Sequence, residues 1–157
     1  MDRKLADLAR FAGQQFRFAF QHMDTHGFAN TALGTTMTGW WTPKYHLQVL
    51  QTDDAAFVEA MAMNWLDADH RAWKFAGIVM NGSITVDGKS HNSLILRSQT
   101  TDHSRRLVAY HPYYGEANKE EPWLTPFVDF PADRQVSPRT QKAVQDIMLK
   151  TRLGIVT

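Results

Sequence analysis

The 157-residue sequence contains no cysteine. This absence excludes disulfide bonds, thiolate catalysis, and zinc or iron–sulfur sites that need cysteine ligands. An excess of charge of one sign is also missing, because 17 basic and 16 acidic side chains give a formal net charge of +1. No global field would steer the protein toward nucleic acid or an anionic membrane, and we expect neither partner.

Long hydrophobic runs are missing as well. Asp7, Arg10 and Arg17 interrupt the apolar residues of the first 20 positions, and no run approaches the roughly 20 apolar residues that cross a bilayer. Repeats, low-complexity tracts and linkers are equally absent. We therefore expect a soluble cytoplasmic protein that folds as a single domain over residues 1–157, with one hydrophobic core.

Helices are predicted at both ends of the chain. Apolar residues recur with helical spacing from Leu5 to Met23, and Gly27 follows as a stop. The last helix begins with Ser137 as N-cap, has Pro138 at its first position and ends at Gly154. Two side chains of the first helix lie off its apolar stripe, and we expect them to meet a second element or a partner subunit. They are Phe11 and Phe18.

The region between residues 30 and 66 is open to two interpretations. Threonine-rich, aromatic and alternating segments favour two short strands between Asn30 and Gln51. A second helix would then follow Thr52, carry "AAFVEAMAMNWL" and lie at the centre of the fold. In the alternative, Thr42 caps one long helix that runs through to Leu66.

A β region is predicted from about Trp73 to Tyr114, where Asp87-Gly88 indicates a two-residue hairpin turn. If the two strands are paired residue by residue from that turn, both faces of the hairpin carry a mixture of apolar and polar side chains. A bulge at Asn81-Gly82 would correct this, because it sets Met80 opposite Leu94 and Ile78 opposite Leu96. We therefore predict one long bulged hairpin whose apolar residues share one face.

The predicted fold class is α+β: an antiparallel sheet of about five strands with helices on one face. The element order is α-β-β-α-β-β-β-α. This order is similar to that of profilin-like and roadblock-type scaffolds. The similarity concerns element order alone and implies no function.

The bulged register predicts a candidate binding surface on the polar face of the sheet. It brings together five side chains from the hairpin and the next strand: His91, Ser93, Arg97, His111 and Tyr113. An ordinary solvated outer face is the alternative interpretation. No cofactor and no metal site are predicted from this set.

Three other patterns could carry chemistry. His22 and His26 are spaced to share one helical face, as a metal site would need, although a capping or exposed pair is the preferred interpretation. "TDHS" at Thr101 to Ser104 places a carboxylate beside a histidine, a pattern that also suits turns. Six large aromatics could line a ligand pocket or fill the core: Trp40, Trp41, Tyr45, Trp65, Trp73 and Trp123.

Two classes of function follow. The first is a non-catalytic binding or protein-interaction module, expected to be a homodimer because of Phe11 and Phe18. The second is a small hydrolase or metal-dependent enzyme that uses histidines on the exposed sheet face, namely His91 and His111. The sequence leaves open whether the protein is an enzyme at all.

Overall fold

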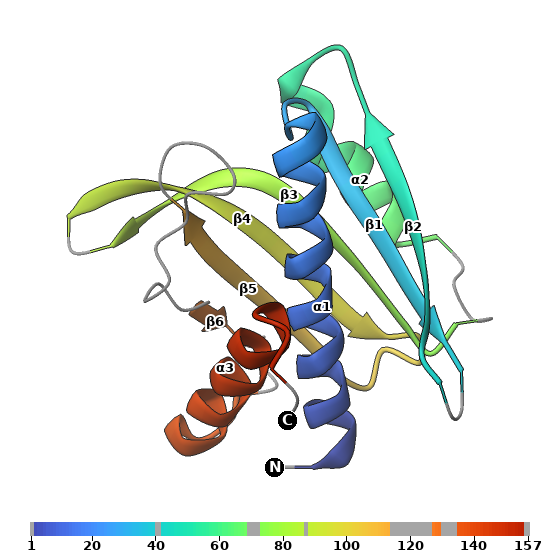
Figure 1. The fold of residues 1–157 in the computed structure, drawn as a ribbon, viewed down its shortest axis with the longest axis vertical. Helices are drawn as coiled ribbons and strands as arrows, with labels where there is room; N and C mark the ends of the chain where they lie inside the picture. Colours follow the sequence, from blue (N-terminus) through green and yellow to red (C-terminus); the bar gives the residue numbers. More distant parts are fainter. Residues whose placement is uncertain are drawn as a thin grey trace.

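The computed structural model describes residues 2–39, 42–68, 73–86, 88–113, 127–129 and 135–155. These residues form an antiparallel sheet with strand order β2-β1-β3-β4-β5-β6, together with α-helices on both of its faces (Figure 1). The strands are β1 (Thr31–Thr38), β2 (Lys44–Gln51), β3 (Phe75–Val86), β4 (Lys89–Thr100), β5 (Arg106–Tyr113) and β6 (Phe127–Asp129). The helices are α1 (Arg3–His26), α2 (Val58–Leu66) and α3 (Pro138–Arg152), and a 3₁₀ turn, η1 (Ala55–Phe57), precedes α2.

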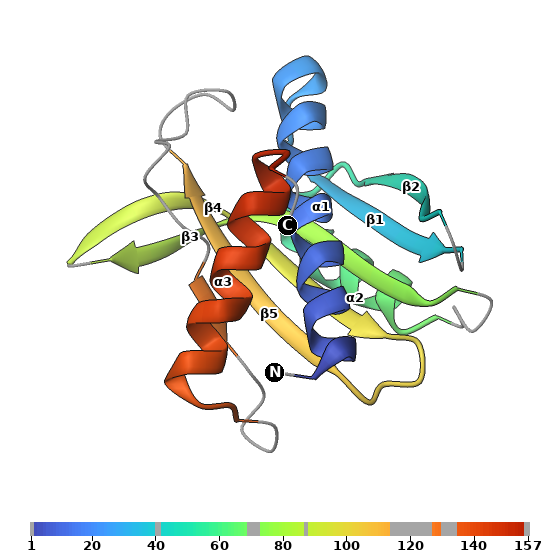
Figure 2. The same cartoon turned by 60° about the horizontal axis from the view of Figure 1, so that its bottom comes forward.

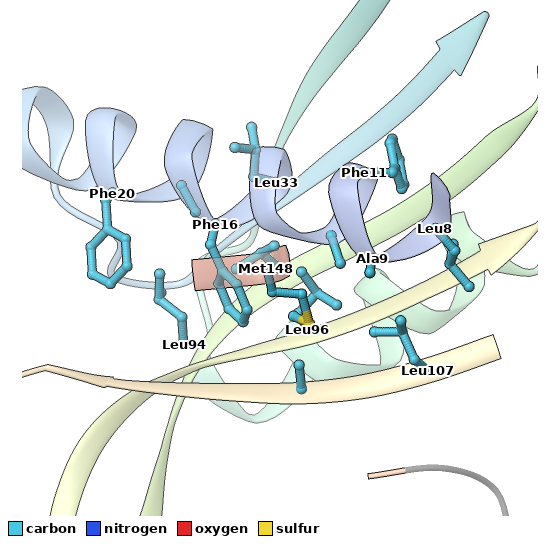
Figure 3. Packing of buried hydrophobic residues seen from close by; sticks show 14 of the residues in the cluster. Leu8, Ala9, Phe11, Phe16, Phe20, Leu33, Leu94, Leu96, Leu107 and Met148 are labelled. Carbon is cyan, nitrogen blue, oxygen red and sulfur yellow. The ribbon is translucent and has the colours of Figure 1, made fainter. Parts of the chain in front are cut away.

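Helix α1 is the central helix of the fold. It begins at Asp2, whose carboxylate accepts a hydrogen bond from the Leu5 amide at 2.7 Å, and it ends at Gly27 with φ of 74°. Its apolar stripe packs on β3, β4 and β5, and α3 lies beside it on the same face (Figure 2). Phe16 is fully buried there beside Leu96 and Met148 (Figure 3).

The α+β class and the predicted element order are confirmed, with β6 as a short sixth strand. The arrangement of the helices differs from the prediction. Helix α2 covers the face of the sheet opposite α1, where Ala62 and Leu66 pack against Ile78 and Met80. It is not the central helix, because it has only nine residues and buries only those two, whereas Phe57 before it is 60% exposed.

The predicted bulge at Asn81-Gly82 is wrong. Strands β3 and β4 pair without interruption from Val86 opposite Lys89, so that Asn81 faces Leu94 and Ile78 faces Arg97. The bulge was inferred in order to gather all apolar residues on one face. That requirement does not apply here, because β3 is covered by α1 on one face and by α2 on the other.

Three further local predictions are confirmed, whereas the cap expected at Thr52 is supplied by Asp54 at the start of η1. Residues 30–51 contain the two strands β1 and β2, so the long helix from Thr42 does not form. Ser137 caps α3 by accepting from the Thr140 amide at 3.2 Å, and Pro138 is its first residue. The off-stripe Phe11 and Phe18 both contact Tyr45 of β2, at ring-centroid distances of 6.4 Å and 5.3 Å. They therefore meet a second element of the same chain.

Helices α1 and α3 approach each other closely at Gly13. A Cβ atom at this position would lie 2.6 Å from the Met148 carbonyl oxygen and 2.8 Å from Thr151 Cβ. Glycine normally weakens a helix interior by about 1 kcal/mol relative to alanine. Its presence in the middle of α1 is explained by this contact with the backbone of α3.

We predict that Gly13→Ala lowers the free energy of unfolding by about 1–3 kcal/mol, because the backbone contact outweighs the gain in helix propensity. Chemical denaturation measures the change. Gln21→Ala, at an exposed position of α1, is the matched control and should be neutral or slightly stabilising. A Gly13→Ala protein as stable as the wild type would show that the two helices are not held at this distance.

Candidate functional site

The five residues predicted to form a binding surface lie on both faces of the sheet. His91, Ser93 and Arg97 are on the face that carries α2, because the Leu94 and Leu96 positions that alternate with them belong to the core beneath α1. Ser93 is buried, whereas His91 and Arg97 are partly exposed. These three residues share a face as predicted.

His111 and Tyr113 lie on the opposite face, in the core beneath α1. The structure pairs His111 with Leu94, and Tyr113 with Asn92. The prediction had paired them with Ser93 and His91, and this shift of one residue turns each side chain of β5 to the other face. The predicted cluster is therefore divided between two surfaces.

His111 is fully buried and is surrounded mainly by aromatic rings. Its ring meets the edges of Phe16 and Phe20 at 5.3 Å and 5.0 Å, and its Nδ1 lies 3.0 Å from the Pro112 carbonyl oxygen. Burial and then the nearby Arg152 guanidinium lower the pKa of His111 from 6.5 to about 4. At neutral pH this histidine is an uncharged core residue.

Tyr113 also has a structural environment. It is 5% exposed, and its hydroxyl donates a hydrogen bond of 2.6 Å to Asn81 Oδ1. Burial raises the pKa of this phenol above its usual 10. The bond therefore ties β5 to β3 at the place where the long hairpin extends beyond the sheet (Figure 1).

The other sequence patterns have mainly local roles. The rings of His22 and His26 stack at 4.8 Å, but the described residues contain no group of three or more potential metal ligands. Asp102 accepts hydrogen bonds from the amide and hydroxyl of Ser104, at 2.9 Å and 2.7 Å, which is a turn interaction. These bonds keep the pKa of Asp102 well below its usual range.

A cleft that was not predicted from the strand pairing lies beside the first turns of α1. One cavity of about 580 Å³ lies between α1, the end of β1 and the residues that lead into β3. A hollow of about 250 Å³ shares Arg3, Asp7, Gly39 and Lys74 with it and extends toward Tyr45. We call the two together the N-terminal cleft. The volume of the larger cavity is typical of binding sites for small molecules.

The described lining of the N-terminal cleft is strongly basic. It contains four cations, Arg3, Lys4, Arg10 and Lys74, against the single carboxylate of Asp7. Asp7 is 3.1 Å from Arg10 and 4.0 Å from Lys74, and Asp102 outside the lining is 3.7 Å from Lys4, so the two carboxylates offset the four cations only in part. The arrangement favours an anionic ligand, because an excess of positive charge in a concave surface concentrates anions.

Aromatic side chains form the apolar wall of the cleft. Phe75 packs on Phe11 with ring centroids 5.4 Å apart, and Phe11 in turn stacks on Tyr45. The Lys74 ammonium lies 5.4 Å from the centroid of the Phe75 ring. Trp73 adds a partly exposed indole to the larger cavity. Phe11 and Phe75 are buried, so an apolar or aromatic body would pack on the partly exposed Tyr45 and Trp73 with its anionic group near the cations.

The sequence contained two signals for this cleft. Tyr45 and Trp73 belong to the six aromatics considered as pocket residues, and both line it; Trp40, Trp41 and Trp123 lie outside the described residues. The second signal is the placement of Arg3 and Lys4 in the first turn of α1, which contains no acidic residue. Cations are disfavoured at this positive end of a helix. Their presence there is a local conflict of the kind that functional sites show.

Comparisons with protein-family models, with curated proteins and with solved structures find no match for this chain. In the described part of the chain, no helix has the length and apolar character needed to span a bilayer. The function must therefore be argued from the geometry of the chain itself.

The buried His111 predicts a pH dependence of stability. Its pKa is about 4 in the folded protein and 6.5 as the ordinary value, so the unfolded chain binds the proton more readily. The part of the free energy of unfolding that depends on uncharged His111 is fully present above pH 6.5 and is lost as the pH falls toward 4. The loss amounts to about 3 kcal/mol, at 1.36 kcal/mol for each pKa unit.

Denaturation curves at pH 7 and pH 4.5 measure this loss in the wild type and in His111→Phe. Phenylalanine cannot titrate, so the variant should lose markedly less stability across this interval. The exposed His26→Phe serves as the control and should keep the wild-type dependence. Equal pH dependence in the wild type and in His111→Phe would contradict the assignment.

Proposed function

We propose that the protein is a non-catalytic binding module whose N-terminal cleft holds a small organic anion with an aromatic or apolar body. The observation that carries this proposal is the combination of cations and aromatic side chains along two adjoining cavities: Arg3, Lys4, Lys74 and Trp73 line the one of about 580 Å³, and Arg10 and Tyr45 line the one of about 250 Å³. The cations provide charge recognition, and the rings provide apolar contact area. The proposal includes the cytoplasmic location and the homodimeric state expected from the sequence, although Phe11 and Phe18 pack on Tyr45 of the same chain and no longer support a dimer.

The enzyme alternative is not favoured by the geometry. It depended on His91 and His111 acting from one exposed face, and these residues belong to opposite faces of the sheet. A general base must come within hydrogen-bond distance of the proton that it removes. His111 is enclosed by the core and offers no such access from the surface.

We predict that naphthalene-1-sulfonate binds to the protein in isothermal titration calorimetry, and that its affinity falls with added salt as exposed charges are screened. The double substitution Arg3→Gln with Lys74→Gln should weaken binding about tenfold, corresponding to about 1.4 kcal/mol. Both side chains are exposed, so the folded structure should persist. Far-ultraviolet circular dichroism checks this.

The matched control is Arg139→Gln together with Lys142→Gln. It removes the same charge from exposed positions of α3 that do not line the cleft. It should bind like the wild type. Titration with the neutral 1-naphthalenemethanol and with inorganic phosphate separates the two parts of the ligand, and each should bind more weakly than the sulfonate. The proposal fails if both double variants bind the sulfonate equally well, or if the wild type does not bind it at millimolar concentration.

A further inference from the structure

The outer edge of β2 has unpaired hydrogen-bonding groups. This strand ends the sheet, and its inner edge pairs with β1. The Thr52 amide donates to the Asn30 carbonyl oxygen at 3.1 Å, which identifies the even-numbered residues of β2 as those bonded to β1. The amides and carbonyls of the odd-numbered residues therefore point outward. In the described part of the chain, no strand pairs with them.

The side chains along this edge are suited to association. Leu47 is 50% exposed and Val49 is 44% exposed, on the same face of the sheet as α1, because Val49 lies opposite the core residue Leu33. Edge strands are usually protected by interior charges, proline or bulges. Within β2 the only charge is Lys44 at its first position, the strand contains no proline, and its pairing with β1 is continuous.

We propose that two copies of this chain dimerise through antiparallel pairing of their β2 strands, centred on Gln48. This inference rests on the homodimer of the proposed function and specifies its interface. Leu47 lies opposite the partner's Val49, and Tyr45 lies opposite the partner's Gln51. The two sheets then continue into one another, with both α1 helices on the same face.

The backbone geometry favours a second copy as the occupant of this edge. The register joins odd-numbered residues to odd-numbered residues, so every outward-pointing amide finds an outward-pointing carbonyl, giving about eight hydrogen bonds in four pairs. It also keeps the exposed apolar side chains of both copies on one face. Lys44 lies beyond the last of these pairs, and no like charges oppose each other along the strands.

Gln48 lies on the two-fold axis of this dimer. It belongs to a pair without mutual backbone hydrogen bonds, whose Cα atoms are about 4.5 Å apart in an antiparallel ladder. That separation lies within the range that disulfides span. Because the chain has no natural cysteine, Gln48→Cys introduces a single reactive thiol.

The first experiment oxidises Gln48→Cys and, as a matched control, Ser83→Cys, whose residue is exposed on β3. Non-reducing electrophoresis at low micromolar protein concentration should show most of the Gln48→Cys protein as a covalent dimer. Ser83→Cys should remain monomeric in the same gel. Equal cross-linking of the two variants would overturn the proposed register.

The second experiment measures molar mass by light scattering at several protein concentrations. The wild type should be dimeric at high micromolar concentration, and Leu47→Lys with Val49→Lys should be monomeric. Both positions are exposed, so folding should persist, as thermal unfolding would show. Phe57→Lys removes another exposed apolar side chain, outside β2, and should remain dimeric.

The outcomes separate the interface from the function. If the wild type is a dimer and the double lysine variant remains one, the β2 interface is wrong while the homodimer stands. If the wild type is a monomer throughout, both the interface and the homodimer are wrong. Binding of naphthalene-1-sulfonate is measured on the same samples, so a failure of the cleft and a failure of the interface are read from separate measurements.

Discussion

The structure depends on the burial of β1 and β3 on both faces of the sheet. Val79 packs beneath α1, whereas its neighbour Ile78 packs against α2. Residues 31–37 of β1 and 75–80 of β3 are therefore all buried, and small residues are needed there where other side chains approach. The Trp65 ring lies against Gly34 on one face, and the Gln15 amide lies against Gly77 on the other. A side chain at either glycine would collide with these groups.

This two-sided burial explains which features the sequence could predict. Helix boundaries depend on local signals, so the cap at Ser137 and the stop at Gly27 lie where predicted, and the cap expected at Thr52 lies two residues later at Asp54. The strands and their order follow from alternation and turns. The face on which each helix packs is a long-range property that no local pattern contains. The assumption of a single apolar face therefore introduced the bulge between β3 and β4, and a separate error of one residue in the pairing of β4 with β5 misplaced His111.

The N-terminal cleft could not be predicted from the sequence for the same reason. Its lining comes from three separate stretches of the chain, represented by Arg3, Tyr45 and Lys74, and only the folded sheet brings them together. The aromatic residues were recognisable as pocket candidates by type alone. The basic residues were not, because their meaning depends on the cavity beside them. Charges at an unfavourable helix end are the second local feature that could have directed attention to this region.

Strand β2 connects the two proposals. Its first odd-numbered residue that faces α1 is Tyr45, which packs on Phe11 in the cleft wall, and the next two are the exposed Leu47 and Val49. In the β2-paired dimer, the partner's Gln51 lies opposite Tyr45. Any ligand that orders the cleft wall would then also order the strand that forms the interface. Linkage is reciprocal. If the ligand raises the affinity of the two chains for one another by some factor, dimerisation raises the affinity for the ligand by the same factor.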